Sequence, residues 1–254
     1  MNLLNFKKMN INNSIGSWIT LGNIGIVEVM ADAGFDWLCI DLEHSVIDYK
    51  EVQNLIIVIQ SKGIKAYVRV GKNDSLIIKR VLDAGADGII IPSVNSAKEA
   101  QQAVGAVKYP PYGKRGVGLA RAQGYGFDFE KYRDFSSKEI ILIVQIEHFN
   151  GINELENILR IDGIDGTFVG PYDLSGSIGK PGKFEDSEYL SLLEKYNEIT
   201  NKYDKLKGFH VVPIDHELIK NKFDEGYNFI AYSFDAYFLG HILREQFNKI
   251  KNYN

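Results

Sequence analysis

The chain alternates between two hydrophobic patterns. Segments with apolar residues three and four positions apart, which is the spacing of a helix, end near a glycine, and a short run of β-branched residues follows. Gly34, Gly63, Gly85 and Gly226 stand at four of these boundaries. A glycine just past a helix accepts the left-handed conformation that ends it. The pattern therefore predicts strand–helix units joined into a parallel sheet.

This pattern contains eight strands and eight helices. The expected strands are residues 15–20, 37–42, 64–70, 88–92, 140–146, 166–169, 208–212 and 229–232. The expected helices are residues 24–33, 49–61, 75–84, 97–107, 152–159, 188–203, 216–224 and 235–249. Eight strands that are each followed by a helix predict an α/β fold of the (β/α)8 TIM-barrel type, as one domain over residues 1–254. A doubly wound open sheet is the alternative, but no Gly-x-Gly-x-x-Gly follows the first strand.

Two connections between these elements are unusually long and rich in glycine and proline, residues 108–127 and 170–186. Long connections in a compact domain are usually functional. The second one leaves the sixth expected strand at its C-terminal end, where such barrels carry their active sites. The first follows a helix, and we expect it to contain additional local structure.

Composition and charge narrow the partners and the compartment. A net charge of −4 without a clustered basic face argues against nucleic-acid binding. Cys39, the only cysteine, lies in an apolar run, so we expect a buried core thiol rather than a nucleophile. One cysteine, no apolar signal segment in the first ten residues and no run of membrane-spanning length together predict a cytoplasmic protein without a membrane partner.

Polar residues gather where the expected strands end. The relevant residues are Trp18, Glu43, His44, Arg69, Gln145, Glu147 and Asp173. Glu147 and Asp173 are carboxylates on neighbouring strands with no obvious cation between them, which is unfavourable unless something neutralises them. A divalent cation that prefers oxygen ligands, Mg²⁺ or Mn²⁺, would do so. The alternative is that each carboxylate is a solvated loop residue.

His44 and Arg69 carry the other candidate chemistry. A histidine that closes a barrel strand beside carboxylates is a candidate base. Arg69 lies in an apolar strand, where it either awaits an anion or pairs with an internal carboxylate. By pattern alone, Asp83 is a helix-surface acid and His210 is a core histidine whose ring is satisfied.

Several of these motifs occur together in order along almost the whole chain. They are Asp41-Leu-Glu-His44, Val68-Arg69-Val70, Leu82-Asp83-Ala-Gly85, Tyr109-Pro-Pro-Tyr-Gly-Lys-Arg115-Gly-Val-Gly118, Gln145-Ile-Glu147 and Val169-Gly-Pro-Tyr-Asp173. In this combination the chain resembles the HpcH/HpaI family of pyruvate-dependent class II aldolases. The resemblance implies reversible cleavage of a 4-hydroxy-2-oxo acid to pyruvate and an aldehyde.

The resemblance also implies a role for individual residues. Glu147 and Asp173 correspond to the metal ligands, with Mg²⁺ or Mn²⁺ expected and Co²⁺ a further candidate. His44 corresponds to the catalytic base and Asp83 to its orienting partner, while Arg69 contacts the pyruvyl oxygen. The implied substrate pocket comprises Trp18, Arg69, Gln145, Gly170, Pro171, Tyr172 and Asp173. Homo-oligomers built from dimers that exchange the last helix, residues 235–249, and often hexamers, are also implied.

The departures from the resemblance concern the substrate. Residues 45–48 and 122–127 differ from familiar members, so the resemblance does not identify the aldehyde.

Three rival functions stay open. A Schiff-base aldolase needs a desolvated lysine at a strand end, and none is found. A CoA-ester lyase of the citramalyl-CoA type needs a basic groove, for which only Lys108, Lys114 and Arg115 qualify. The third rival is a barrel that binds an oxo acid without catalysis.

Overall fold

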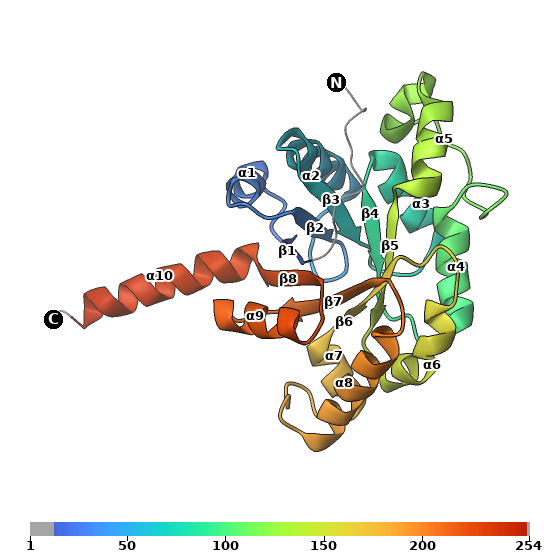
Figure 1. Cartoon of the computed structure of the whole chain (residues 1–254). Helices are drawn as coiled ribbons and strands as arrows, with labels where there is room; N and C mark the ends of the chain where they lie inside the picture. Colours follow the sequence, from blue (N-terminus) through green and yellow to red (C-terminus); the bar gives the residue numbers. More distant parts are fainter. Residues whose placement is uncertain (1–12, 253–254) are drawn as a thin grey trace.

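Eight parallel strands close into a barrel in the computed structural model, which describes residues 13–252 (Figure 1). The strands follow chain order, and β8 pairs with β1 to complete the barrel. The predicted TIM barrel is confirmed. The outer limits of the predicted domain lie outside the described residues, and so do the first ten residues, in which no signal segment is expected.

Every predicted strand and helix is present with somewhat different ends, and two further helices, α5 and α7, were not predicted. The strands are β1 Ser14–Ile19, β2 Trp37–Asp41, β3 Lys65–Arg69, β4 Gly88–Ile91, β5 Ile141–Ile146, β6 Gly166–Val169, β7 Leu206–Val211 and β8 Phe229–Phe234. The helices are α1 Ile24–Asp32, α2 Tyr49–Ser61, α3 Ser75–Ala84, α4 Ala97–Val107, α5 Phe129–Lys138, α6 Phe149–Leu159, α7 Pro171–Ser177, α8 Ser187–Thr200, α9 His216–Asp224 and α10 Asp235–Lys251.

Both long connections contain short helices. The first includes a 3-10 helix, Arg121–Gly126, and leads into α5, as the expected extra structure. The second begins with α7, whose N-cap is Gly170 and whose first residue is Pro171. Proline suits this position because the first helical N–H needs no partner within the helix. The start of α7 is therefore fixed next to the end of β6.

Aromatic rings fill the interior of the barrel. Trp37 stacks on Phe229 with ring centroids 4.2 Å apart, and both side chains are fully buried. Glycines on the strands leave room for these rings, since a Cβ added to Gly16 would lie 1.9 Å from the Trp37 ring. Cys39 belongs to the same buried cluster, so the expectation of a core thiol is confirmed.

Asp235 ties the last helix to the first strand. Its carboxylate accepts hydrogen bonds from the backbone N–H groups of Thr20 and Leu21 and from the Thr20 hydroxyl, at 2.6–3.0 Å. Asp235 is buried and also stands in the first turn of α10, where the helix dipole favours a negative charge. These bonds fix the point and direction at which α10 leaves the barrel.

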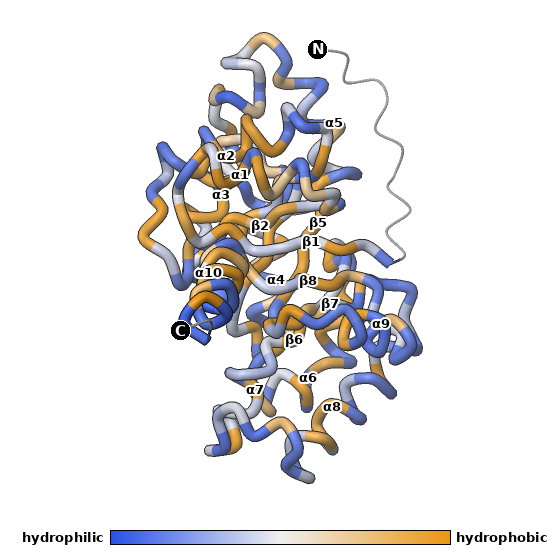
Figure 2. The backbone as a smooth tube through the Cα atoms, turned by 90° about the vertical axis from the view of Figure 1, so that its left-hand side faces the viewer, coloured by the Kyte–Doolittle hydropathy of each residue, from blue (hydrophilic) through white to orange (hydrophobic). Residues whose placement is uncertain are grey.

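Beyond that point α10 extends away from the barrel (Figure 1). Asp235 is its only buried residue among those described. Apolar side chains three and four positions apart are half or more exposed along it: Leu239, Ile242, Leu243, Phe247 and Ile250. Hydrophobic and hydrophilic residues alternate along the helix accordingly (Figure 2). This is the pattern of an amphipathic helix whose apolar face is not covered by its own chain.

None of the helices within residues 13–252 has the length and apolar character needed to cross a membrane.

Candidate functional site

A buried ion pair joins the ends of β2 and β3. Arg69 donates from Nε and Nη2 to the two carboxylate oxygens of Asp41, at 2.9 and 2.6 Å. Asp41 Oδ1 also accepts from the backbone N–H groups of Glu43 and His44 at 2.9 and 3.3 Å. Burial opposes the charge on Asp41, but the bonds from Arg69 and the backbone outweigh it, and the pKa of Asp41 is lowered.

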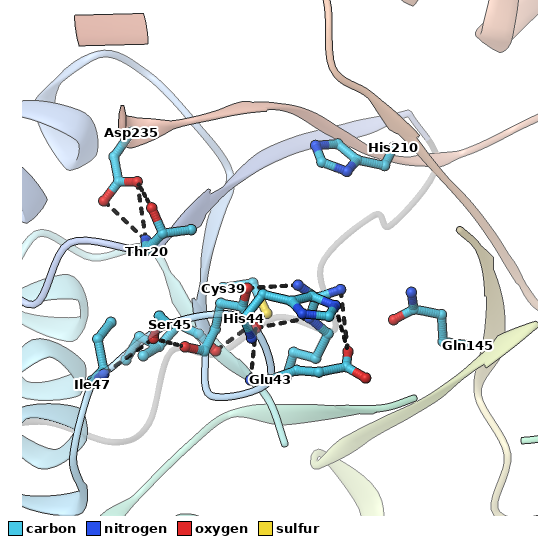
Figure 3. Close-up of polar contacts among 12 residues, drawn as sticks. Thr20, Cys39, Glu43, His44, Ser45, Ile47, Gln145, His210 and Asp235 are labelled. Carbon is cyan, nitrogen blue, oxygen red and sulfur yellow. Dashed lines mark hydrogen bonds and ion pairs between the residues drawn. The ribbon is translucent and has the colours of Figure 1, made fainter. Parts of the chain in front are cut away.

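Glu43 and His44 follow this pair at the barrel mouth (Figure 3). Glu43 Oε2 lies 3.4 Å from Arg69 Nη1 and 3.7 Å from His44 Nε2. Burial raises the pKa of Glu43 to about 7, although the charge of Arg69 acts in the opposite direction. The negative charges of Glu147, Asp41 and Asp173 add to the increase. The His44 side chain is 63% exposed, so its ring is open to solvent and to a bound substrate.

Glu147 follows β5 and is held by two neighbours. Its Oε1 accepts from the backbone N–H and the hydroxyl of Ser93, both at 2.7 Å, and its Oε2 accepts from Gln145 Nε2 at 2.6 Å. Burial is the main reason why the pKa of Glu147 is raised, and the nearby charge of Asp173 adds to it. Ser93 adopts a φ of 54°, which is uncommon for a residue with a side chain.

The start of α7 closes the opposite side of the mouth. Asp173 stands in the first turn of this helix and is exposed. A Cβ at Gly170 would lie 2.9 Å from Gln145 Nε2 and 3.1 Å from Glu147 Oε2. The bare backbone of Gly170 therefore lets β6 and α7 approach the Glu147 carboxylate.

These elements surround a small cavity of about 50 Å³. Its lining contains all seven residues of the predicted substrate pocket together with Phe168 and His210: Trp18, Arg69, Gln145, Phe168, Gly170, Pro171, Tyr172, Asp173 and His210. The structure brings the seven together at the predicted end of the barrel. No lysine among residues 13–252 belongs to this lining.

Trp18 and His210 are two of the aromatic residues in the wall of the cavity. The Arg69 guanidinium carbon lies 4.4 Å from the centre of the Trp18 ring. His210 packs edge-on against the same ring at 5.7 Å, and its Nε2 lies 3.3 Å from the carbonyl oxygen of Ser233. Burial lowers the pKa of His210 to about 4, so this ring is neutral at pH 7. The expected core histidine is thus also a cavity residue.

The donor set at the mouth fits a hard divalent cation with few protein ligands. Within residues 13–252 there is no cluster of three or more His, Cys, Asp or Glu side chains arranged to hold a metal. Glu147 and Asp173 repel each other, and the buried oxygens Glu43 Oε2 and Gln145 Oε1 have no hydrogen-bond partner. Mg²⁺ commonly binds through one or two carboxylates and keeps other positions for water and substrate.

Asp83 is not near His44 within one chain. It lies in the last turn of α3, at the end of the barrel opposite to the mouth, because each helix runs back along the outside of the strands. Its Oδ1 accepts from Arg115 Nη2 at 2.6 Å and from Gln123 Nε2 at 2.9 Å. The carboxylate that lies near His44 in the structure is Glu43.

Sequence reasoning missed Asp41 and Ser93 as site residues, and it gave Glu43 no chemical role. The signal for Asp41 was the lone arginine in β3, which requires a buried counter-charge. Strand alternation would place Glu43 on the face opposite to His44, but β2 ends at Asp41, so alternation does not extend to it. Nothing in the sequence indicates that the backbone of Ser93 bends towards Glu147.

The family model for HpcH/HpaI aldolase/citrate lyase matches residues 14–241. A hydroxypyruvate/pyruvate aldolase of Roseobacter denitrificans is 36% identical over 222 residues, which cover 87% of this chain and 86% of that protein. A 4-hydroxy-2-oxovalerate aldolase of Rhodococcus jostii is 36% identical over 226 residues, which cover 89% of this chain and 86% of that protein.

Solved structures agree with these relatives. An HpcH/HpaI aldolase from Desulfitobacterium hafniense superimposes with a TM-score of 0.87 at 28% identity, covering 95% of this chain and 93% of that one. A citrate lyase β subunit of M. tuberculosis, solved with oxaloacetate and magnesium, shares the fold at 13% identity. Its TM-score is 0.58, and the match covers 90% of this chain and 96% of that one.

The raised pKa of Glu43 should appear in the stability of the metal-free protein. Its pKa rises from 4.5 to about 7 on folding, so the unfolded chain loses this proton first as the pH increases. The free energy of unfolding should therefore fall across this window by up to about 3 kcal/mol relative to Glu43→Gln, which keeps its amide neutral. Urea unfolding in EDTA between pH 4.5 and 8 measures the difference. Glu130→Gln, at an exposed position on α5, is the control. If the difference in the free energy of unfolding between the wild type and Glu43→Gln does not change with pH, the raised pKa of Glu43 is contradicted.

Proposed function

The chain belongs to the HpcH/HpaI aldolase/citrate lyase family, and on this premise we propose that its barrel mouth cleaves a 4-hydroxy-2-oxo acid reversibly to pyruvate and an aldehyde. Its relatives are named aldolases, so the chain is a carbon–carbon lyase. We also propose that the cleavage depends on a divalent cation, Mg²⁺ or Mn²⁺ with Co²⁺ as a further candidate, held by Glu147 and Asp173.

One observation carries this proposal. Arg69 and Asp173 face the same small cavity, and Glu147 adjoins it through its hydrogen bond to Gln145. No lysine of the described part of the chain belongs to its lining. A Schiff-base aldolase requires a lysine at this place. Two carboxylates and one guanidinium instead suit a mechanism in which developing negative charge is balanced electrostatically.

The residues divide the reaction between them. Cleavage breaks the C3–C4 bond, takes the proton from the 4-hydroxyl group and leaves an electron pair on the pyruvyl fragment. Arg69 lies beside Trp18 with its orientation fixed by Asp41, and it stabilises the negative charge on the 2-oxo oxygen. A divalent cation bound between Glu147 and Asp173 would supply Lewis-acid polarisation of the same group. A proton added to C3 completes pyruvate.

His44 is the proposed base for the 4-hydroxyl proton. Its ring is exposed at the mouth, and Glu43 lies close enough to hold a positive charge on it. Trp18, Gln145, Gly170, Pro171 and Tyr172 shape the pocket around the oxo acid. Asp83 accepts a hydrogen bond from Arg115 at the opposite end of the barrel, so it takes no part in this chemistry within one chain.

Metal dependence tests the main proposal. Pyruvate release from a panel of 4-hydroxy-2-oxo acids, with 4-hydroxy-2-oxovalerate included, should fall about 100-fold or more in EDTA and return with Mg²⁺ or Mn²⁺. Glu147→Gln should lose the same activity and its restoration by metal. Glu185→Gln, an exposed position with no contact at the mouth, should keep full activity.

Two outcomes would reject this mechanism. A covalent adduct trapped by borohydride in the presence of pyruvate would indicate a lysine imine. Cleavage of citramalyl-CoA, but of no free 4-hydroxy-2-oxo acid, would favour the CoA-ester lyase. Hydroxypyruvate should also be supplied in the condensation direction, because the R. denitrificans relative is named for it.

The role of His44 can be separated from the rest of the mouth. His44→Ala should reduce aldol cleavage by about 10²- to 10⁴-fold, the usual contribution of a general base. Decarboxylation of oxaloacetate leaves the same pyruvyl electron pair but removes no hydroxyl proton, so the variant should keep it. Equal loss of both reactions would assign His44 to binding or to structure, and His216→Ala on α9 serves as the control.

We further propose that α10 packs against a second copy of the chain in a dimer-based homo-oligomer. Its exposed apolar face supports this arrangement. The double variant Leu239→Glu with Leu243→Glu should lower the mass measured by light scattering after size-exclusion chromatography. Gln246→Glu with Asn248→Glu adds the same charge at exposed polar positions of α10 and should leave the mass unchanged. A monomeric wild-type protein would refute the proposal.

A further inference from the structure

A second and larger cavity lies on the outer wall of the barrel between α3 and α4. Its volume is about 560 Å³, which is within the range of small-molecule sites. None of its lining residues belongs to the cavity at the mouth. The lining consists of Ser75, Lys79, Lys98, Gln101, Gln102, Gly105, Ala106, Lys114, Arg115 and Gly116.

This groove is positively charged without compensation. Lys79 comes from α3, Lys98 from α4 and Lys114 from the loop after α4, and no carboxylate belongs to the lining. Across residues 13–252, the amino groups of these three lysines have no hydrogen bond or ion pair. Cations grouped around a concave surface raise the local potential and favour anions. The chain as a whole has a net charge of −4, so this local excess of positive charge does not follow from its overall composition.

The nearby carboxylates are already engaged. Asp83, one turn after Lys79, accepts from Arg115 and Gln123. Glu99, next to Lys98, accepts from the backbone N–H of Asn95 at 2.7 Å and from Ser96 at 3.1 Å. The charge of Arg115 is balanced by Asp83, so the three lysines are the cations left for a ligand.

The loop that carries Lys114 is fixed in place. The backbone N–H of Lys114 donates to the carbonyl of Gly105 at 2.6 Å, and that of Arg115 donates to the carbonyl of Lys108 at 3.0 Å. Lys114 is therefore presented from a defined position at the end of α4.

Gly105 keeps the groove open. It lies inside α4, where glycine is unfavourable relative to alanine. A Cβ there would meet nothing within 4 Å, and its φ is not positive, so neither packing nor backbone geometry requires glycine. Since Gly105 lines the cavity, a larger side chain at this position would fill the groove instead of clashing with the fold.

We propose that this groove binds a small phosphorylated molecule with two or more negative charges. Lysine binds phosphate as a point charge, and three such charges suit a ligand with more than one anionic group. Gln101 and the hydroxyl of Ser75 provide neutral hydrogen-bonding groups beside them. The site is separate from the aldolase mouth, so its test is a binding measurement that does not depend on turnover.

The probe is sodium pyrophosphate, titrated calorimetrically into the full-length protein in EDTA at about 0.15 M NaCl. We expect saturable binding of one pyrophosphate per chain. Lys79→Gln with Lys98→Gln and Lys114→Gln should weaken it by roughly tenfold or more, because each lost charge pair weakens binding. Gly105→Leu should weaken it equally while keeping the melting temperature of the wild type.

The matched control removes three exposed lysines elsewhere: Lys131→Gln, Lys202→Gln and Lys220→Gln. It changes the net charge equally and should bind like the wild type. Absence of saturable binding, or the same loss in the control, would overturn the proposal. Binding of citrate as tight as that of pyrophosphate would show that phosphate is not what the groove selects. A change in oligomeric state in the lysine variant would make the groove a protein interface.

Discussion

The buried pair between Asp41 and Arg69 is the interaction on which the mouth depends. Asp41 uses its remaining capacity to hold the backbone N–H groups of Glu43 and His44, so one carboxylate sets both the arginine and the segment after β2. Removing one partner of a buried pair usually costs about 3–5 kcal/mol, because the other charge stays buried alone. A change at Asp41 would therefore alter the position of the base, of Glu43 and of the guanidinium together.

Charge is distributed unevenly over the molecule. At the mouth, Glu43, Glu147 and Asp173 face one guanidinium that Asp41 already neutralises, and the pKa values of Glu43 and Glu147 rise as a result of burial and mutual repulsion. On the outer wall, three lysines have no acidic partner among the residues that the structure describes. The same physical rule applies to both places: like charges held together by the fold are unfavourable until an opposite charge arrives.

The barrel could be predicted because hydrophobic periodicity and glycines at helix ends are local signals. Trp18, Arg69, Gln145 and Asp173 could be predicted because strand ends of a parallel barrel meet at one rim. Gly170, Pro171 and Tyr172 were implied only by the family resemblance. Contacts set by side chains from distant segments could not. Asp83 lies in a helix at the other end of the barrel, where Arg115 and Gln123 reach it from a long connection. Glu43 lies beside Arg69 because the chain turns after Asp41, and no periodic pattern encodes that turn.

The bonds around Asp235 also have a geometric consequence. The 17 residues of α10 make a rod about 25 Å long that is attached at one end. A tilt of about 5° at the attachment would move the far end by about 2 Å, which is more than a packed interface tolerates. The hydrogen bonds from Thr20 and Leu21 therefore fix the angle at which α10 leaves the barrel. This angle in turn determines the orientation of any neighbour that packs on the far end of the helix.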